Sequence, residues 1–180
     1  MQFISSYQAQ SSIPEKSKSE ILQLLLDIGE CADDLTVNSF YLSYLCARGK
    51  IHEVESFIKQ LGEHTAEVIN MKHMQFYMGT ALHVAMGWNS GKLGVDLFDL
   101  LWSHGAKYCQ DYYGMYPCTQ LDQMMWVKPI LFGHESFLGF RNKTEFVDMY
   151  EHLRETYGLL EYESGMEKYV FDEEDEGYGN

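Results

Sequence analysis

Cysteine and histidine could support the widest range of chemistry in this chain, but their spacing favours neither catalysis nor metal binding. The 7 histidines show no H-x₃-H pair and no carboxylate cluster at zinc-ligand spacing. None of the 4 cysteines belongs to a C-x-x-C pair. A nucleophilic thiol needs a neighbouring base or a lowered pKa, and the sequence places no base beside Cys118. We therefore expect no metal, no cofactor and no enzyme activity, with a Cys/His hydrolase as the catalytic alternative.

Two further segments contain residue types used in enzymes. Residues 87–93 (GWNSGKL) have a partial phosphate-loop pattern, but the segment is one residue short, and Leu93 stands where a metal-binding Ser or Thr is required. It also follows an expected helix instead of a strand. Residues 134–136 (HES) lack the glycines of a nucleophile elbow. Neither segment predicts nucleotide binding or hydrolysis.

Composition and charge narrow the classes of partner. The chain has 180 residues, 46% of them hydrophobic, which is enough for a sizeable core. Its net charge of −14 disfavours nucleic acid and anionic membranes, and it would attract a basic protein. Solubility alone is the other interpretation of this charge. The chain has no apolar run near the ~20 residues of a membrane span, no secretory leader in residues 1–12 and no disulfide framework, so we expect a cytoplasmic protein.

Apolar periodicity and helix boundary residues predict a series of short helices. Ser17 and Glu20 form a capping-box pattern ahead of a helix that Gly29 ends. The next two predicted helices cover residues 41–46 and 51–61, and glycine turns follow them at Gly49 and Gly62. Two short helices joined by such a turn make a helical hairpin.

The next hairpin is expected to contain a longer insertion. Thr80 is a good N-cap for a helix through Met86. A glycine-rich insert over residues 87–94 would then precede a helix over 95–102. Farther on, Pro117 can open a helix over 118–126, and a cap pattern at residues 142–145 introduces a helix with Leu153 and Tyr157 on one face.

The motifs within these helices resemble the ankyrin repeat. Residues 79–85 (GTALHVA) resemble the opening G-x-T-P-L-H-x-A, and residues 100–106 (LLWSHGA) resemble the close L-L-L-x-x-G-A. Residues 114–117 (GMYP) look like the start of the next unit. Ala81 replaces the usual proline, and the units are spaced 40 (82 − 42) and 36 (118 − 82) residues apart, so the repeats are degenerate.

The resemblance, which covers about residues 20–123, implies a fold and a set of structural residues. The fold is all-α: a short ankyrin-like helical-hairpin solenoid with protruding hairpin loops and divergent capping helices. Gly79 would adopt a positive φ, Thr80 would cap its helix, and His83 would bond backbone across the loop. The residues expected to be structural are Gly79, Thr80, Leu82, His83, Gly105, Gly114 and Pro117.

Four regions follow from these patterns. Residues 1–18 are rich in Ser and Gln and form a flexible lead-in, and residues 19–126 hold the ankyrin-like repeats. Residues 127–170 form a divergent C-terminal cap. Residues 171–180 form an acidic disordered tail. From Arg141 onward, 12 acidic and 4 basic residues give a local charge of −8.

The two loops between helical pairs carry aromatic and methionine side chains where such loops are usually polar. These residue types are enriched at the centres of protein interfaces. The alternative is that they pack loop against loop or beneath the C-terminal segment. The partner-binding residues that we predict are His73, Met74, Phe76, Tyr77, Tyr112, Tyr113 and Met115.

The resemblance and the charge together favour a binding protein over an enzyme. Ankyrin-like arrays rarely perform chemistry, and fold alone does not give function. We expect a stoichiometric inhibitor of a basic protein, such as an immunity protein that neutralises a cognate toxin, present as a monomer or in a 1:1 hetero-complex. A viral or pathogen decoy acting on host signalling proteins is the alternative within the same class.

Overall fold

The computed structural model describes residues 15–73, 79–89, 91–112, 114, 116–117 and 151–159. The regular elements of this part are helices, which confirms the all-α expectation, and a single antiparallel bridge joins His73 and Gly79. In chain order they are α2 (Lys18–Asp27), α3 (Asp34–Ala47), α4 (Ile51–Leu61), the 3₁₀ turn η1 (Gly62–His64), α5 (Thr65–Asn70), α6 (Ala81–Trp88), α7 (Gly91–Ser103) and a helical segment over 151–157.

The first helix forms as its cap pattern predicts. The Ser17 side chain accepts the Glu20 N–H at 3.3 Å, and the Glu20 carboxylate accepts the Ser17 N–H at 2.6 Å. Gly29 follows the C-cap with a φ of +76°, a value at which glycine avoids the strain of a side chain. Both ends of α2 were therefore predictable from local sequence.

Helix α3 is longer than its apolar pattern indicated. The sequence predicted a helix from Tyr41, but α3 begins at Asp34, because the Asp33 carboxylate accepts the Thr36 N–H at 2.8 Å and caps the helix there. Most of α3 is buried, and it contacts α2, α4, α5 and α6. This helix is therefore the centre of the described fold.

The prediction of a glycine-rich insert over residues 87–94 is wrong. Helix α6 continues through Trp88, and α7 begins at Gly91, so only two residues separate them. Asn89 makes this short connection possible, since its side-chain amide donates to the Ala85 carbonyl at 2.9 Å and to the Cys46 carbonyl at 2.8 Å. One side chain thus ends α6 and fastens it to α3.

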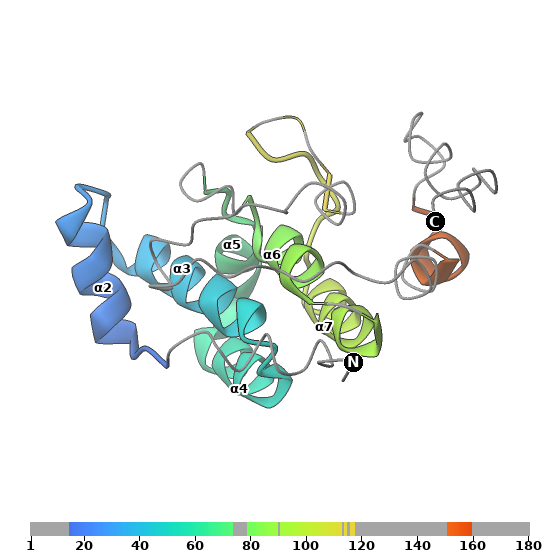
Figure 1. The fold of residues 1–180 in the computed structure, drawn as a ribbon, viewed down its shortest axis with the longest axis horizontal. Helices are drawn as coiled ribbons and strands as arrows, with labels where there is room; N and C mark the ends of the chain where they lie inside the picture. Colours follow the sequence, from blue (N-terminus) through green and yellow to red (C-terminus); the bar gives the residue numbers. More distant parts are fainter. Residues whose placement is uncertain are drawn as a thin grey trace, which may run out of the picture.

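The helices pack in two neighbouring rows. Helices α3 and α6 form one row, and α4 and α7 form the other. The two rows contact each other through the pairs α3–α4 and α6–α7. Figure 1 shows α2 at one end of this group and α4 along the edge opposite to the segment 105–117. The largest fully buried side chains are Tyr44, Phe40, Phe98, Ile21, Leu25, Leu42, Ile58, Ile69, Leu82 and Met86.

A C-terminal helical segment docks on α7. The Tyr157 ring lies 5.3 Å from Phe98 and 5.0 Å from Trp102 between ring centroids. Asp99 Oδ1 accepts the Tyr157 hydroxyl at 2.5 Å and lies 2.9 Å from His152 Nε2. The expected face with Leu153 and Tyr157 therefore points to the core, and Leu153 is buried.

Several predicted features lie outside the described residues. These are the lead-in up to residue 14, the helix over 118–126, the cap pattern at 142–145, most of the C-terminal cap and the acidic tail. Within the part that the structure describes, no helix combines the length and the apolar character needed to span a bilayer.

Candidate protein-binding surface

The bases of the two predicted binding loops are joined through one asparagine. Asn70, at the end of α5, donates from its side-chain amide to the Gly105 carbonyl at 2.8 Å, and its Oδ1 accepts the Lys107 N–H at 2.7 Å. The same amide also donates to Ala66 within α5. The segment that leads into the first loop is thus hydrogen-bonded to the segment that leads into the second loop. Sequence reasoning missed Asn70, because its partners lie 35 and 37 residues away.

The first loop closes on a two-residue bridge. His73 donates its N–H to the Gly79 carbonyl at 2.8 Å, and Gly79 donates back to the His73 carbonyl at 3.1 Å. Gly79 has a φ of +58°, as the repeat resemblance implied. A Cβ there would also stand 2.8 Å from the His83 ring and 3.1 Å from Asp111. The loop tip, with the predicted contact residues Met74, Phe76 and Tyr77, lies outside the described residues.

His73 does not fit the partner contact predicted for it. Its side chain is 5% exposed, its Nε2 lies 2.7 Å from the Ser39 hydroxyl, and its ring packs 3.9 Å from the Phe40 ring. Burial lowers the pKa of His73 to about 4, which keeps the ring neutral at pH 7. Periodicity could not show that the loop base turns this histidine back onto α3.

Thr80 and His83 form a buried cap at the start of α6. His83 Nδ1 accepts the Thr80 backbone N–H at 3.1 Å and lies 2.8 Å from the Thr80 hydroxyl. Both side chains are almost fully buried, as is Leu82. The N-cap position predicted for Thr80 is confirmed. A structural role for the pair stays a prediction that stability measurements can test.

The second loop presents one exposed aromatic ring. Tyr112 is 57% exposed, whereas the preceding Asp111 is buried close to Gly79. Tyr108 and Tyr116 stack at 5.4 Å beneath the loop, and Pro117 is buried. The predicted contacts Tyr113 and Met115 lie outside the described residues, and Gly105 and Gly114 both have positive φ. Among the predicted binding residues that the structure describes, Tyr112 is the one available to a partner.

A groove lies where the loop bases meet α5. It has a volume of about 450 Å³, and Leu35, Ala66 and Met71 contribute apolar side chains to it. Glu67 and Lys107 supply charged groups to its lining. Figure 1 shows the segment 105–117 projecting beyond the helices on this side of the molecule. The complete set of lining residues is Leu35, Ala66, Glu67, Asn70, Met71, Gly105 and Lys107.

The described cysteines and histidines include a deeply buried thiol and no three-residue cluster suited to a metal ion. Cys46 is completely buried, and burial raises the pKa of its thiol to about 12, so it is not a thiolate at pH 7. Cys118 lies outside the described residues. No group of three or more His, Cys, Asp or Glu side chains suited to a metal ion occurs within the described ranges.

A second exposed apolar feature lies on α2. Leu22, Leu26 and the C-cap residue Ile28 are 36%, 54% and 41% exposed, while Ile21 and Leu25 on the other side of the helix are buried. The sequence showed only that this helix is strongly apolar, because its leucines follow one another too closely to define a single face.

Comparisons with protein families, with curated proteins and with solved structures found no match to this chain.

Proposed function

We propose that this chain is a non-catalytic protein-binding module built as a short ankyrin-like array. The pairing of helices supports this arrangement, since α3 neighbours α6 and α4 neighbours α7, as first and second helices of successive units would. The Thr80–His83 cap and the positive φ of Gly79 support it as well, because the repeat motif has a cap and a glycine at these positions. The short connection between α6 and α7 also suits a repeat more closely than the insert expected from sequence.

The observation that carries the binding proposal is the pair of loops fastened at their bases. Asn70 holds both chain segments, and the buried Asp111 of the second segment lies close to Gly79 at the base of the first loop. A rigid base lowers the entropy lost when loops bind a partner. Tyr112 is exposed on this base and offers large contact area with few rotatable bonds.

Site-specific photo-crosslinking in cells of the native source tests the location of the contact. A photoreactive phenylalanine derivative at position 112 should crosslink one predominant protein, which mass spectrometry would identify. The matched control carries the same group at position 92, an exposed site at the start of α7, the end of that helix opposite to the second loop. Equal crosslinking from both positions would contradict a loop-centred interface.

Within this class we propose stoichiometric inhibition of a basic protein, with an immunity protein that neutralises a toxin as the leading case. The net charge of −14 supports a basic partner, since opposite charge speeds encounter at long range. The association rate should then fall steeply between about 50 and 500 mM salt, which shortens the Debye length several-fold. A rate that stays flat over this range would remove the support for a basic partner.

A further inference from the structure

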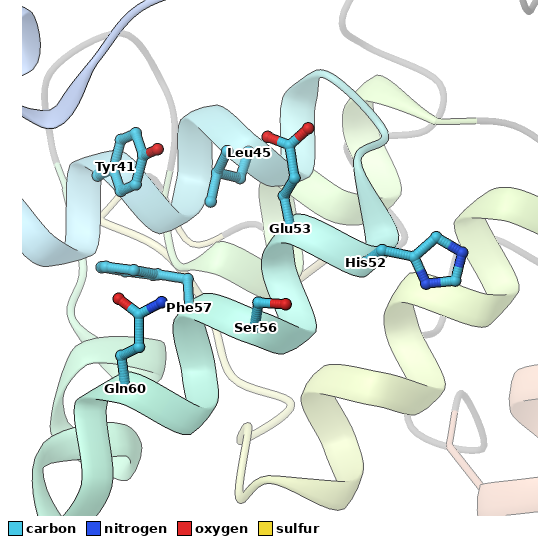
Figure 2. Close-up of a pocket in the computed structure, with 7 residues that line it drawn as sticks. All are labelled: Tyr41, Leu45, His52, Glu53, Ser56, Phe57 and Gln60. Carbon is cyan, nitrogen blue, oxygen red and sulfur yellow. The ribbon is translucent and has the colours of Figure 1, made fainter.

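A second groove lies between α3 and α4, away from the loops. Figure 2 shows Tyr41 and Leu45 reaching into it from α3, with Glu53, Ser56 and Phe57 facing them from α4. Gln60 lies beside the Phe57 ring, and His52 points away at the far end of the groove. The groove has a volume of about 330 Å³. This is near the lower limit of ligand pockets and suits one side chain or a small ligand.

Two aromatic rings form one wall of this groove. The Tyr41 and Phe57 ring centroids are 5.0 Å apart, with an interplanar angle of 89°, and Tyr41 also stacks on Tyr44 at 6.1 Å. Aromatic faces carry partial negative charge and attract cations within about 6 Å. Tyr41 is only partly buried, so its ring is accessible from the groove.

Carboxylates make the same groove negative. Glu53 lines it and, among the residues that the structure describes, forms no ion pair within 4.0 Å. Its neighbour Glu55, by contrast, is paired with Lys59 at 2.8 Å. The pKa of Tyr41 is raised, first by burial and then by the charges of Glu53 and Glu15, with Arg48 opposing them. The two carboxylates thus add to the effect of burial and disfavour a negative charge on Tyr41.

The chain itself places a cation on the adjacent ring. The Arg48 guanidinium carbon lies 5.8 Å from the Tyr44 ring centroid, but Arg48 does not line the groove. The ring contributed by Tyr41 is therefore not covered by this internal cation, and the unpaired Glu53 lies beside it.

We propose that the α3–α4 groove binds an arginine side chain of a protein partner. Its guanidinium would lie against the Tyr41 and Phe57 rings and donate to the Glu53 carboxylate, with Ser56 and Gln60 as further acceptors. Guanidinium suits this site because it is planar, weakly hydrated and able to stack on aromatic rings while donating in its own plane. The groove is made by α3 and α4 alone, so the proposal does not depend on binding at the loops.

Titration of the ¹⁵N-labelled full chain with n-butylguanidinium, followed by NMR, tests the proposal. Amides of α3 and α4 around the groove should shift with a Kd on the order of ten millimolar, because the cation–π contacts, the ion pair with Glu53 and burial of the butyl chain each contribute only weakly. The neutral analogue n-butylurea should bind at least about threefold more weakly, because it lacks the charge that the carboxylate attracts. Equal affinity for the two probes would overturn the proposal.

Two glutamates on α4 provide a matched pair of variants. Glu53→Gln should weaken n-butylguanidinium binding about threefold and leave n-butylurea binding unchanged. Glu55→Gln makes the same change in charge on the same helix, but Glu55 does not line the groove. This variant should therefore leave the affinities for both probes unchanged. Equal weakening by the two variants, or shifts that centre outside α3 and α4, would show a non-specific charge effect and contradict the site.

Discussion

Helices α3 and α6 occupy neighbouring places in the fold but begin in different ways. Helix α6 has 8 residues and a buried cap of Thr80 and His83, whereas α3 has 14 residues and an exposed cap at Asp33. Aligned at the repeat spacing of 40 residues (82 − 42), Phe40 takes the place of Thr80, and Ser43 takes that of His83. The longer helix runs straight through the position at which the shorter one starts.

The two α3 residues at the positions of Thr80 and His83 have opposite consequences: one leaves a buried hydroxyl without a hydrogen bond, and the other supports the first loop. The Ser43 hydroxyl is buried, and no hydrogen-bond partner for it exists among the described residues. Phe40, by contrast, packs against the His73 ring and supports the base of the first loop. A helix that lacks a capping residue at this position can therefore begin farther upstream, where another acceptor, here Asp33, caps it.

The largest expected effect on folding is at Gly79, which the α6 unit requires. Gly79→Ala would force a side chain into a φ of +58° and place a Cβ 2.8 Å from the His83 ring. Backbone strain and overpacking together should lower the free energy of unfolding by about 2–4 kcal/mol, measured by urea denaturation. Gly29→Ala is the control, because Gly29 has a φ of +76° but no atom within 4 Å of the added Cβ. It should cost about 1 kcal/mol, and equal losses at both glycines would argue against a crowded loop base.

The cap itself should have the next largest effect. His83→Ala removes the acceptor for the Thr80 N–H in a fully buried setting and should lower the free energy of unfolding by about 1–3 kcal/mol. Ser43→Ala is the aligned change in α3 and removes a hydroxyl without a partner, so stability should change by less than about 0.5 kcal/mol or rise. Similar losses for the two variants would mean that His83 contributes packing alone.

The smallest expected effect is at the exposed cap of α3. Asp33→Ala should lower the Tm slightly, and Asp33→Asn should keep most of the stability, because the amide oxygen can still cap. The hydrogen bond from the Thr36 N–H, followed by that from Cys31, lowers the pKa of Asp33 in the folded chain. Its contribution is therefore full above the ordinary pKa of an Asp side chain, and it disappears as the pH falls through the lowered folded value. Thermal melts over this acid range should show a smaller pH dependence for Asp33→Asn than for the parent, and identical profiles would contradict the assignment.

Local sequence predicted those parts of the fold that local forces determine. The bounds of α4 match the apolar period over 51–61, and the starts of α2 and α6 match their capping residues. Helix α5 was missed because it has only 6 residues, and its buried Val68 and Ile69 gain their packing from α3 and α6. The start of α7 was missed because Gly91 and Gly94 argue against a helix unless tertiary contacts outweigh their propensity.

The candidate surface could be predicted less completely, since its geometry depends on distant contacts. Exposed Tyr112 is consistent with the expected contact surface, but nothing in the spacing indicated that His73 would turn inward to Ser39. Nor did it indicate that Asn70 would hold the two loops together. Residue types suggested which segments contact a partner, and only the fold separates the side chains that face solvent from those that brace the loops.

The most direct test of the central claim compares binding and folding for one substitution at the loop surface. Tyr112→Ala removes a ring that is 57% exposed, so the free energy of unfolding should change by less than about 0.5 kcal/mol. If Tyr112 anchors the protein identified by crosslinking, calorimetric titration should show a loss of about 2–4 kcal/mol of binding free energy, or a Kd raised some 30- to 1000-fold. An unchanged Kd, or a loss of folding stability equal to the loss of binding, would contradict a loop-centred binding function.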